Sequence, residues 1–263
     1  MPDTDRDFIN SLAKGLNLLM TFSKDRPRLT LSEVARANQM NLPTARRYLH
    51  TLAKLGFVLK DEHTQTFQLT PKVLRLGSWV IEEMGLRSRL LPHMSAITRA
   101  HDVTTHCAIL EGHEVVTVER LRSSDVVNLD LTAGSRLPAY STSLGKAILA
   151  WLEPAEQEAI IARLDFKPLT PRTITDARSF RRELKRTRRR GYAVADEELT
   201  VGLKTLAVPV FDRQGKVEAS VGVSYPIIRA REDGLEETLV RRLLELSRRA
   251  SAAPPPEAGA AAD

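Results

Sequence analysis

The sequence predicts an α+β protein with two domains, an N-terminal winged helix-turn-helix and a larger C-terminal domain with a mainly antiparallel sheet. Between residues 30 and 69, two short helical patterns precede two strand-like runs, which is the order of elements in a winged helix-turn-helix. Beyond residue 85, helical patterns alternate with β-rich runs that hairpin turns connect. The expected divisions are a winged domain over 1–70, a linker helix over 71–85, a second domain over 86–250 and a disordered tail over 251–263.

Composition limits the class of protein. The chain has 263 residues, enough for two domains, and its 42% hydrophobic and 27% charged residues are typical of a soluble globular protein. No apolar run reaches the roughly 18 residues that a membrane-spanning helix needs, and the acidic N-terminus does not resemble a signal peptide. Cys107 is the single cysteine, so we expect no disulfide framework and a cytoplasmic location. A net charge of +6 is compatible with a polyanionic partner.

Local signals place three helices and a β-hairpin in the first domain. A capping box of Thr30 and Glu33 opens the second helix, and Pro43 suits the first position of the third. Residues 57–59 and 66–69 are expected to form the two strands of a wing around a polar loop. The first helix is expected over 8–22, with an apolar face made by Ile9, Leu12, Leu16 and Leu19.

The third helix is predicted to read DNA. Ala45, Leu49 and Leu52 recur on one face, which leaves a polar and cationic face opposite. In a helix-turn-helix the second helix of the motif enters the major groove, where the guanidinium of Arg46 or Arg47 can bond to guanine. The residues that we expect to contact DNA are Thr44, Arg46, Arg47, His50, Thr51 and Lys54. The alternatives are the solvated face of a surface helix and a winged helix that docks protein.

In the second domain the patterns predict alternating helices and strands. The helices are expected over 86–100, 142–151, 154–164, 179–190 and 232–250. The strands are expected over 105–110, 115–121, 126–131, 192–195, 205–211 and 219–225.

The run 181–190 is the most basic stretch of the chain. We expect it to be the solvated face of a helix, because it lies outside the winged domain and has no interleaved aromatic residue for stacking on bases. A second DNA site is the alternative.

The chain carries no motif of an enzyme or of a metal site. It has no Gly-x-Ser-x-Gly, His-Glu-x-x-His or Cys-x-x-Cys, and its Gly145-Lys146 pair lacks the flanking residues of a phosphate-binding loop. We therefore expect no catalysis, no cofactor and no metal. Asp196, Glu197 and Glu198 could suggest acid–base chemistry, but their place before a glycine turn favours structural or interface roles. The histidines match no metal-binding spacing, and we expect structural or surface roles for His93, His101, His106 and His113, near Cys107.

Residues 136–143 contain two features that would suit an anion. Ser141, Thr142 and Ser143 directly precede a predicted helix, whose unpaired N–H groups and adjacent hydroxyls favour a carboxylate; helix capping alone is the alternative. Arg136 is a candidate to pair with that carboxylate, and an exposed loop arginine is the alternative.

The order of these elements, together with several phrases, resembles the IclR family of bacterial transcriptional regulators. The phrases are SLAKGL at 11–16, LPAYSTSLGKAILA at 137–150 and RGYAVADEE at 190–198, followed by GL at 202–203 and LAVPV at 206–210. The resemblance spans about residues 8–250, and the phrase at 134–140 is most similar to the Pca/Pob-type subgroup, which controls aromatic-acid catabolism. It implies a GAF- or profilin-like effector domain, homodimers or dimers of dimers, and double-stranded palindromic operators; contact with RNA polymerase is a further expected partnership, which effector binding would change.

The resemblance also implies a pocket for a small organic acid. The positions that match the pocket of the family are Ser143, Leu144, Leu203, Thr205, Gly222 and Ser224, with an apolar wall at Leu129 and Leu137. Ala195 and Gly222 stand where some members have an acid and a hydroxyl. Fewer polar groups favour a more apolar ligand, such as an aromatic or longer-chain acid.

Together these inferences predict a ligand-responsive, DNA-binding transcriptional regulator. Its effector is expected to come from aromatic-acid catabolism, with protocatechuate, 4-hydroxybenzoate and β-ketoadipate as candidates. Effector binding would bias the placement of the winged domains through the helix at 71–84. The alternative is a small-molecule-binding protein whose winged helix mediates protein–protein contacts.

Overall fold

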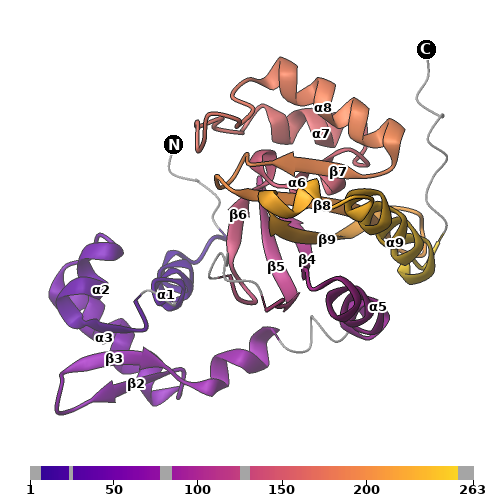
Figure 1. Ribbon diagram of the computed structural model, residues 1–263. Helices are drawn as coiled ribbons and strands as arrows, with labels where there is room; N and C mark the ends of the chain where they lie inside the picture. Colours follow the sequence, from indigo (N-terminus) through magenta and orange to yellow (C-terminus); the bar gives the residue numbers. More distant parts are fainter. Residues whose placement is uncertain (1–6, 24–25, 78–84, 125–130, 254–263) are drawn as a thin grey trace. The chain divides into compact units, whose positions relative to one another are not determined.

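The computed structural model describes residues 7–23, 26–77, 85–124 and 131–253, and the chain divides into two compact units, Met1–Met84 and Gly85–Asp263 (Figure 1). Within these ranges every helix is too short or too polar to span a bilayer. The two units are described separately below.

The first unit, as far as the structure describes it, combines helices with a three-stranded antiparallel sheet. The helices are α1 (Asn10–Met20), α2 (Leu31–Ala37) and α3 (Leu42–Lys54). The strands are β1 (Arg28–Thr30), β2 (Val58–Asp61) and β3 (Thr66–Leu69), in the order β1-β3-β2. The expected winged helix-turn-helix is therefore confirmed. The sequence did not predict β1, because three residues are too few to show the alternation of a strand.

The start of the predicted linker helix follows the wing. A 3₁₀ turn, η1 (Pro71–Val73), leads into helical residues 74–77. The rest of that predicted helix, over 78–84, lies outside the described residues.

Side-chain caps fix where α2 and α3 begin. The backbone N–H of Thr30 donates to Glu33 Oε2 at 2.8 Å, and the N–H of Glu33 donates to Thr30 Oγ1 at 3.3 Å, which completes the predicted capping box. At α3 the cap is Asn41, whose Oδ1 accepts the N–H of Thr44 at 2.9 Å. Pro43 is therefore the second residue of α3 and not the first, because this cap starts the helix one residue earlier than expected.

Helix α1 buries only part of the expected face, since Leu19 alone of its four predicted residues packs against the core of this unit. Leu18 is fully buried, in a core whose described members are Leu18, Phe22, Leu29, Val34, Leu49, Leu52, Val58 and Phe67. Ile9, Leu12 and Leu16 are instead 62%, 59% and 50% exposed. The helix has apolar residues on two of its sides, and the small core of the first unit covers just one of them.

The second unit is built on a six-stranded antiparallel sheet, which confirms the expected sheet type. The strand order is β6-β5-β4-β9-β8-β7, and each pair of neighbours is antiparallel. The strands are β4 (Thr104–Glu111), β5 (Glu114–Leu121), β6 (Arg136–Pro138), β7 (Ala193–Asp196), β8 (Leu203–Phe211) and β9 (Val217–Pro226). The sequence did not predict β6, and the strand expected over 126–131 falls on residues of which only Leu131 is described.

Helices cover both faces of this sheet (Figure 1). On one side lie α6 (Ser143–Leu149), α7 (Pro154–Ile161) and α8 (Ala177–Arg190). On the other lie α5 (Leu86–His101) and α9 (Leu235–Ala250). Two 3₁₀ turns, η2 (Ala139–Ser141) and η3 (Ile227–Arg231), follow β6 and β9.

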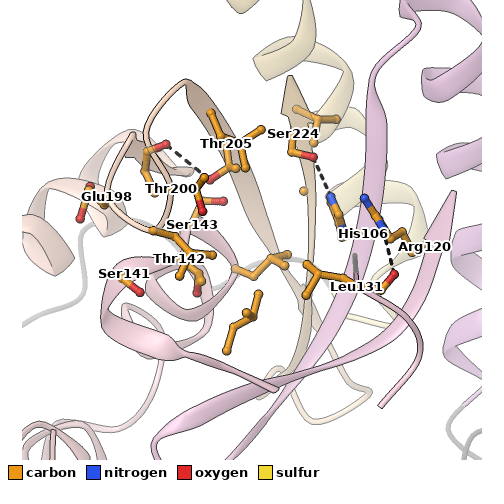
Figure 2. Close-up of a pocket in the computed structure, with 17 residues that line it drawn as sticks. His106, Arg120, Leu131, Ser141, Thr142, Ser143, Glu198, Thr200, Thr205 and Ser224 are labelled. Atoms are coloured by element: carbon orange, nitrogen blue, oxygen red, sulfur yellow. Dashed lines mark hydrogen bonds between the residues drawn. The ribbon is translucent and has the colours of Figure 1, made fainter. Parts of the chain in front are cut away.

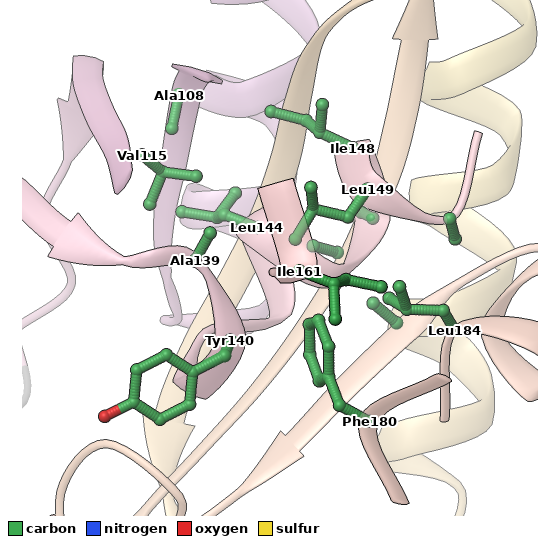
Figure 3. Packing of buried hydrophobic residues seen from close by; sticks show 14 residues of the cluster. Ala108, Val115, Ala139, Tyr140, Leu144, Ile148, Leu149, Ile161, Phe180 and Leu184 are labelled. Atoms are coloured by element: carbon green, nitrogen blue, oxygen red, sulfur yellow. The ribbon is translucent and has the colours of Figure 1, made fainter. Parts of the chain in front are cut away.

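The core on the α6 side joins three helices to the sheet (Figure 3). Ile148 and Leu149 of α6 belong to one buried cluster with Phe180 and Leu184 of α8. Tyr140 of η2 belongs to the same cluster and is 3% exposed. The start of α6 is therefore held between the sheet and the outer helices.

Gly145 allows α6 to approach η2 closely. A β-carbon at this position would lie 2.2 Å from the carbonyl oxygen of Ala139, well inside van der Waals contact. Ala139 is fully buried in the same core, so neither backbone can withdraw without repacking.

We expect Gly145→Ala to destabilise the second unit by about 1–3 kcal/mol, because an added methyl group in a packed core forces neighbouring atoms apart. Gly77→Ala is the matched control, since nothing lies within 4 Å of a β-carbon there. Thermal unfolding followed by circular dichroism measures both variants. Equal midpoints for the two would contradict the close-packing argument.

Candidate functional site

Helix α3 presents its polar residues to solvent. Ala45, Leu49 and Leu52 are buried, in agreement with their spacing in the sequence. The six residues predicted to contact DNA lie on the remaining surface, where Thr44 is half-buried and Arg46, Arg47, His50, Thr51 and Lys54 are exposed.

Two arginines near the start of α3 are available to a partner. Arg46 and Arg47 lie in its first one and a half turns, and neither forms an ion pair within the described part of the chain. Thr51 Oγ1 donates to the carbonyl of Arg47 at 2.9 Å, so this hydroxyl is already engaged within the helix. An exposed guanidinium at this place has the chemistry to bond to guanine in a major groove.

The wing contains a turn that its own acids stabilise. Asp61 Oδ1 accepts the backbone N–H groups of Thr64 at 3.1 Å and His63 at 2.9 Å, and these bonds lower the pKa of Asp61. Lys60 pairs with Glu62 at 2.7 Å. The wing is therefore of mixed charge, and α3 is the more cationic of the two surfaces.

A pocket opens in the second unit between the sheet and the start of α6 (Figure 2). It contains about 590 Å³ of space between atoms, and part of this space is open solvent. Nine of the eleven residues predicted to bind the effector line it, namely Leu137, Ser141, Thr142, Ser143, Leu144, Leu203, Thr205, Gly222 and Ser224. The structure thus brings together segments from β6, α6, β8 and β9.

Two lining residues that the sequence analysis did not select as effector contacts form one side of the pocket, and Arg120 makes that side positive. His106 on β4 and Arg120 on β5 are cross-strand partners, and Figure 2 shows them on the same side of the cavity. Arg120 Nη1 donates to the carbonyl of Leu131 at 2.8 Å, and His106 Nε2 lies 2.8 Å from Ser224 Oγ. Burial, assisted by the charge of Arg120, lowers the pKa of His106 to about 3, so the imidazole is neutral near pH 7.

A β-bulge explains why the hairpin pattern did not reveal this pair. Near the turn the register pairs Ala108 with Thr117, and counting outward from there would place Glu119 opposite His106. The register shifts by one residue between Cys107 and Ala108, which puts Arg120 there instead. Because of this shift, the cationic side chain of Arg120 faces the cavity in place of the carboxylate of Glu119.

Opposite the positive side, the pocket is lined by hydroxyl groups (Figure 2). Thr142 Oγ1 accepts the N–H of Gly145 at 3.0 Å, so this hydroxyl caps α6, as the alternative interpretation of the sequence held. Ser141 Oγ donates to the carbonyl of Pro138 at 3.4 Å. Ser143 Oγ has no hydrogen-bond partner among the described residues and is free to meet a ligand.

Behind this wall a buried ion pair joins α6 to the loop that lines the pocket. Lys146 is fully buried, and its Nζ donates to Glu198 Oε1 at 2.5 Å and to the carbonyl of Val194 at 3.1 Å. Burial lowers the pKa of Lys146 and raises that of Glu198, while the attraction between the two groups opposes both shifts. The pair neutralises Glu198, which is the acid among the lining residues.

Arg136 is not part of this pocket, which corrects the expectation that it pairs with a bound carboxylate. Its guanidinium is bound by two acids of the same chain, Glu114 at 2.7 Å and Glu111 at 2.7 Å. The edge strand β6 pairs with β5, and this pairing places Arg136 beside the acids at the β4–β5 turn. Leu129, the other predicted residue that is missing from the lining, lies outside the described residues.

The remaining acids and the cysteine that the sequence analysis considered are either engaged in ion pairs or buried. Arg172 binds Asp196 at 3.0 Å and Glu197 at 3.2 Å. Burial raises the pKa of Cys107 to about 12, so its thiol is unreactive. In the ranges that the structure describes, no three His, Cys, Asp or Glu side chains converge as metal ligands.

Family models match both units of the chain. Residues 11–62 match the IclR helix-turn-helix domain, and residues 79–252 match the bacterial transcriptional regulator IclR C-terminal domain. The Pca regulon regulatory protein of Pseudomonas putida is 34% identical over 93% of this chain and 84% of its own length. The p-hydroxybenzoate hydroxylase transcriptional activator of Acinetobacter baylyi is 37% identical over 82% of this chain and 80% of its own. The chain belongs to the IclR family.

Solved structures agree with this assignment. A transcriptional regulator from a Rhodococcus species matches this IclR-family chain with a TM-score of 0.80 and 34% identity, over 92% of this chain and 97% of the other. An IclR homologue from Microbacterium hydrocarbonoxydans, complexed with 4-hydroxybenzoate, matches with a TM-score of 0.81 and 27% identity, over 91% and 97%. The chain is therefore a DNA-binding transcriptional regulator and not an enzyme.

The buried His106 predicts that this IclR-family regulator loses stability in acid. Its folded pKa of about 3 lies below the ordinary value of 6.5, so the unfolded state binds the extra proton and stability falls as the pH drops below about 6.5. His106→Asn is expected to reduce the loss in unfolding free energy by about 1.4 kcal/mol for each pH unit below about 6.5. Urea unfolding at pH 7 and at pH 5.5 measures it, with the exposed His113→Asn as control. Equal acid sensitivity of the two variants would show that His106 is not held neutral.

Arg47→Ala is expected to weaken binding to the operator by at least about tenfold, because a bidentate contact with guanine contributes about 1–3 kcal/mol. Lys14→Ala removes the same charge from an exposed position on α1 and should leave affinity within about twofold. Fluorescence anisotropy on the segment that the wild-type protein protects upstream of its own gene provides the measurement. If Arg47→Ala also abolished effector binding, the separation of the two sites would be wrong.

Proposed function

We propose that this regulator controls the catabolism of aromatic acids and that a small acid of such a pathway binds beside Arg120. The proposal rests chiefly on the chemistry of the pocket, which combines apolar walls with Arg120 and a neutral His106 on one side. Ser143 offers a hydroxyl on the opposite side. A carboxylate would meet the guanidinium and a ring hydroxyl would meet the serine, so a hydroxybenzoate suits both sides.

The relatives support the same class of ligand. The names of two of them refer to the Pca regulon and to p-hydroxybenzoate hydroxylase, and one structural neighbour holds 4-hydroxybenzoate. We accordingly propose 4-hydroxybenzoate, protocatechuate and β-ketoadipate as the first ligands to test. Effector binding would act on the affinity for a double-stranded operator or on contact with RNA polymerase, in the cytoplasm where such DNA lies.

We further propose that the regulator is a homodimer or a dimer of dimers that binds a palindromic operator. An exposed apolar stripe on α1, formed by Ile9, Leu12, Leu16 and Met20, supports this oligomerisation. Leu12, Leu16 and Met20 follow one another at intervals of four, so they share one face of the helix, and Ile9 directly precedes the helix as its N-cap. A second copy of the chain would cover this face, and two-fold symmetry in the protein would match two half-sites in the DNA.

Arg120→Gln is expected to weaken the binding of 4-hydroxybenzoate by at least about tenfold, because a charge-assisted hydrogen bond to the carboxylate is lost. Isothermal titration calorimetry with the full-length protein provides the measurement. Arg136→Gln is the matched control, since it removes the same charge from a residue outside the pocket. The uncharged 4-hydroxybenzamide should bind the wild type and Arg120→Gln almost equally.

Two results would oppose the proposed site. If Arg136→Gln weakened binding and Arg120→Gln did not, the carboxylate would lie at the edge of the sheet and not in the pocket. If none of the three acids bound or shifted the melting temperature of the wild-type protein, aromatic-acid sensing would be wrong.

A further inference from the structure

We propose that α8 carries a second contact surface for DNA, a cationic stripe that binds the phosphate backbone of a duplex without reading its sequence. The stripe consists of Arg178, Arg182, Lys185 and Arg189. The proposal extends to a second surface the DNA binding that α3 provides, and it is independent of the identity of the effector.

The four residues form one straight row along α8. Their intervals of four, three and four place them on a single face of the helix, over about 16 Å at 1.5 Å per residue. All four are exposed. The opposite face carries Phe180, Leu184 and Thr187, which are buried, so packing fixes the direction in which the stripe points.

Acidic side chains form ion pairs with other cations of α8, whereas among the described residues the stripe has only the longer-range attraction of Asp176 for Arg182. Arg181 pairs with Glu158 at 2.6 Å, and Arg190 pairs with Glu183 at 2.8 Å. Across the residues that the structure describes, none of the four stripe side chains forms an ion pair, and Arg182 donates to the hydroxyl of Ser179.

The like charges of the stripe repel one another and destabilise α8, and a bound polyanion would relieve this repulsion. Like charges at i and i+4 on a helix destabilise it by a few tenths of a kcal/mol per pair, and the stripe contains two such pairs. The first three stripe residues also line a surface depression, together with Arg181, Gln157 and Glu158. Positive charge is therefore concentrated at a concave place where an anion can approach several donors at once.

Duplex DNA suits this surface better than a protein or a single strand does. Protein interfaces rely on buried apolar or aromatic anchors, and the stripe consists of arginine and lysine alone. Single-stranded nucleic acid is held by stacking on aromatic side chains, which α8 does not present between its cations. Binding to the phosphates of a duplex requires only cations spaced along the backbone, and the guanidinium of arginine is well suited to bind phosphate.

The position of α8 in its unit agrees with this role. Figure 1 shows it as the outermost helix on its side of the sheet, beyond α6 and α7. Once α3 holds the operator, the second unit of the same chain stays near the DNA, so even a weak phosphate contact adds to the affinity.

The test compares two triple variants of the full-length protein that lose the same charge. Arg182→Gln/Lys185→Gln/Arg189→Gln removes the stripe. Arg163→Gln/Arg213→Gln/Lys216→Gln removes three exposed cations from other surfaces of the same unit. Fluorescence anisotropy from 50 to 300 mM salt measures binding to the operator and to a random-sequence duplex of 60 base pairs, and circular dichroism verifies folding.

Loss of the stripe is expected to weaken binding to both duplexes by at least tenfold at 100 mM salt. It should also reduce the slope of log K against log salt by about 1 to 3, since each phosphate contact contributes about 0.9. The control variant should stay within about twofold of the wild type. Arg47→Ala serves as a contrast, because it should weaken operator binding far more than random-duplex binding.

Two outcomes would overturn the proposal. Equal affinities and equal salt slopes for the two triple variants would show that the stripe contributes nothing beyond net charge. A stripe variant that binds DNA as the control does, yet fails to direct transcription by purified RNA polymerase, would assign the surface to a protein partner. Neither assay contains an effector, so failure of the aromatic-acid proposal would leave both results interpretable.

Discussion

The second unit depends on the complete burial of α6. All seven residues from Ser143 to Leu149 are buried, so this helix has no solvent face that could take a bulky or charged side chain. Glycine is therefore required where the helix meets the Ala139 backbone, and Lys146 requires a partner inside the protein. Glu198 provides that partner from the loop that lines the pocket, so the packing of the core also holds one pocket wall in place.

The opposite wall shows how a small change of register determines chemistry. One β-bulge on β4 places Arg120, and not Glu119, beside His106. Burial and the charge of Arg120 then keep the imidazole neutral. A pocket with one cation, several hydroxyls and apolar walls is suited to orient a small acid.

Helices α3 and α8 use cations in different ways. In α3 the arginines lie near the N-terminal end, where a helix-turn-helix meets base edges, and polar residues such as Thr44 and Thr51 accompany them. In α8 the cations run along the whole length of one face, with Phe180 and Leu184 anchoring the other. The first arrangement suits recognition of sequence and the second suits recognition of charge alone.

The sequence by itself determined the class of both units, because helix periodicity, the Thr30–Glu33 capping box and strand alternation are local signals. It also pointed to nine of the lining residues, seven through the resemblance to the IclR family and two, Ser141 and Thr142, through their place before a helix. It could not choose between Arg136 and Arg120, since their neighbours come from pairing across the sheet and from a bulge that no local pattern marks. Tertiary structure likewise decided which side of α1 is buried and which cations of α8 have acidic partners, because packing between distant segments sets both.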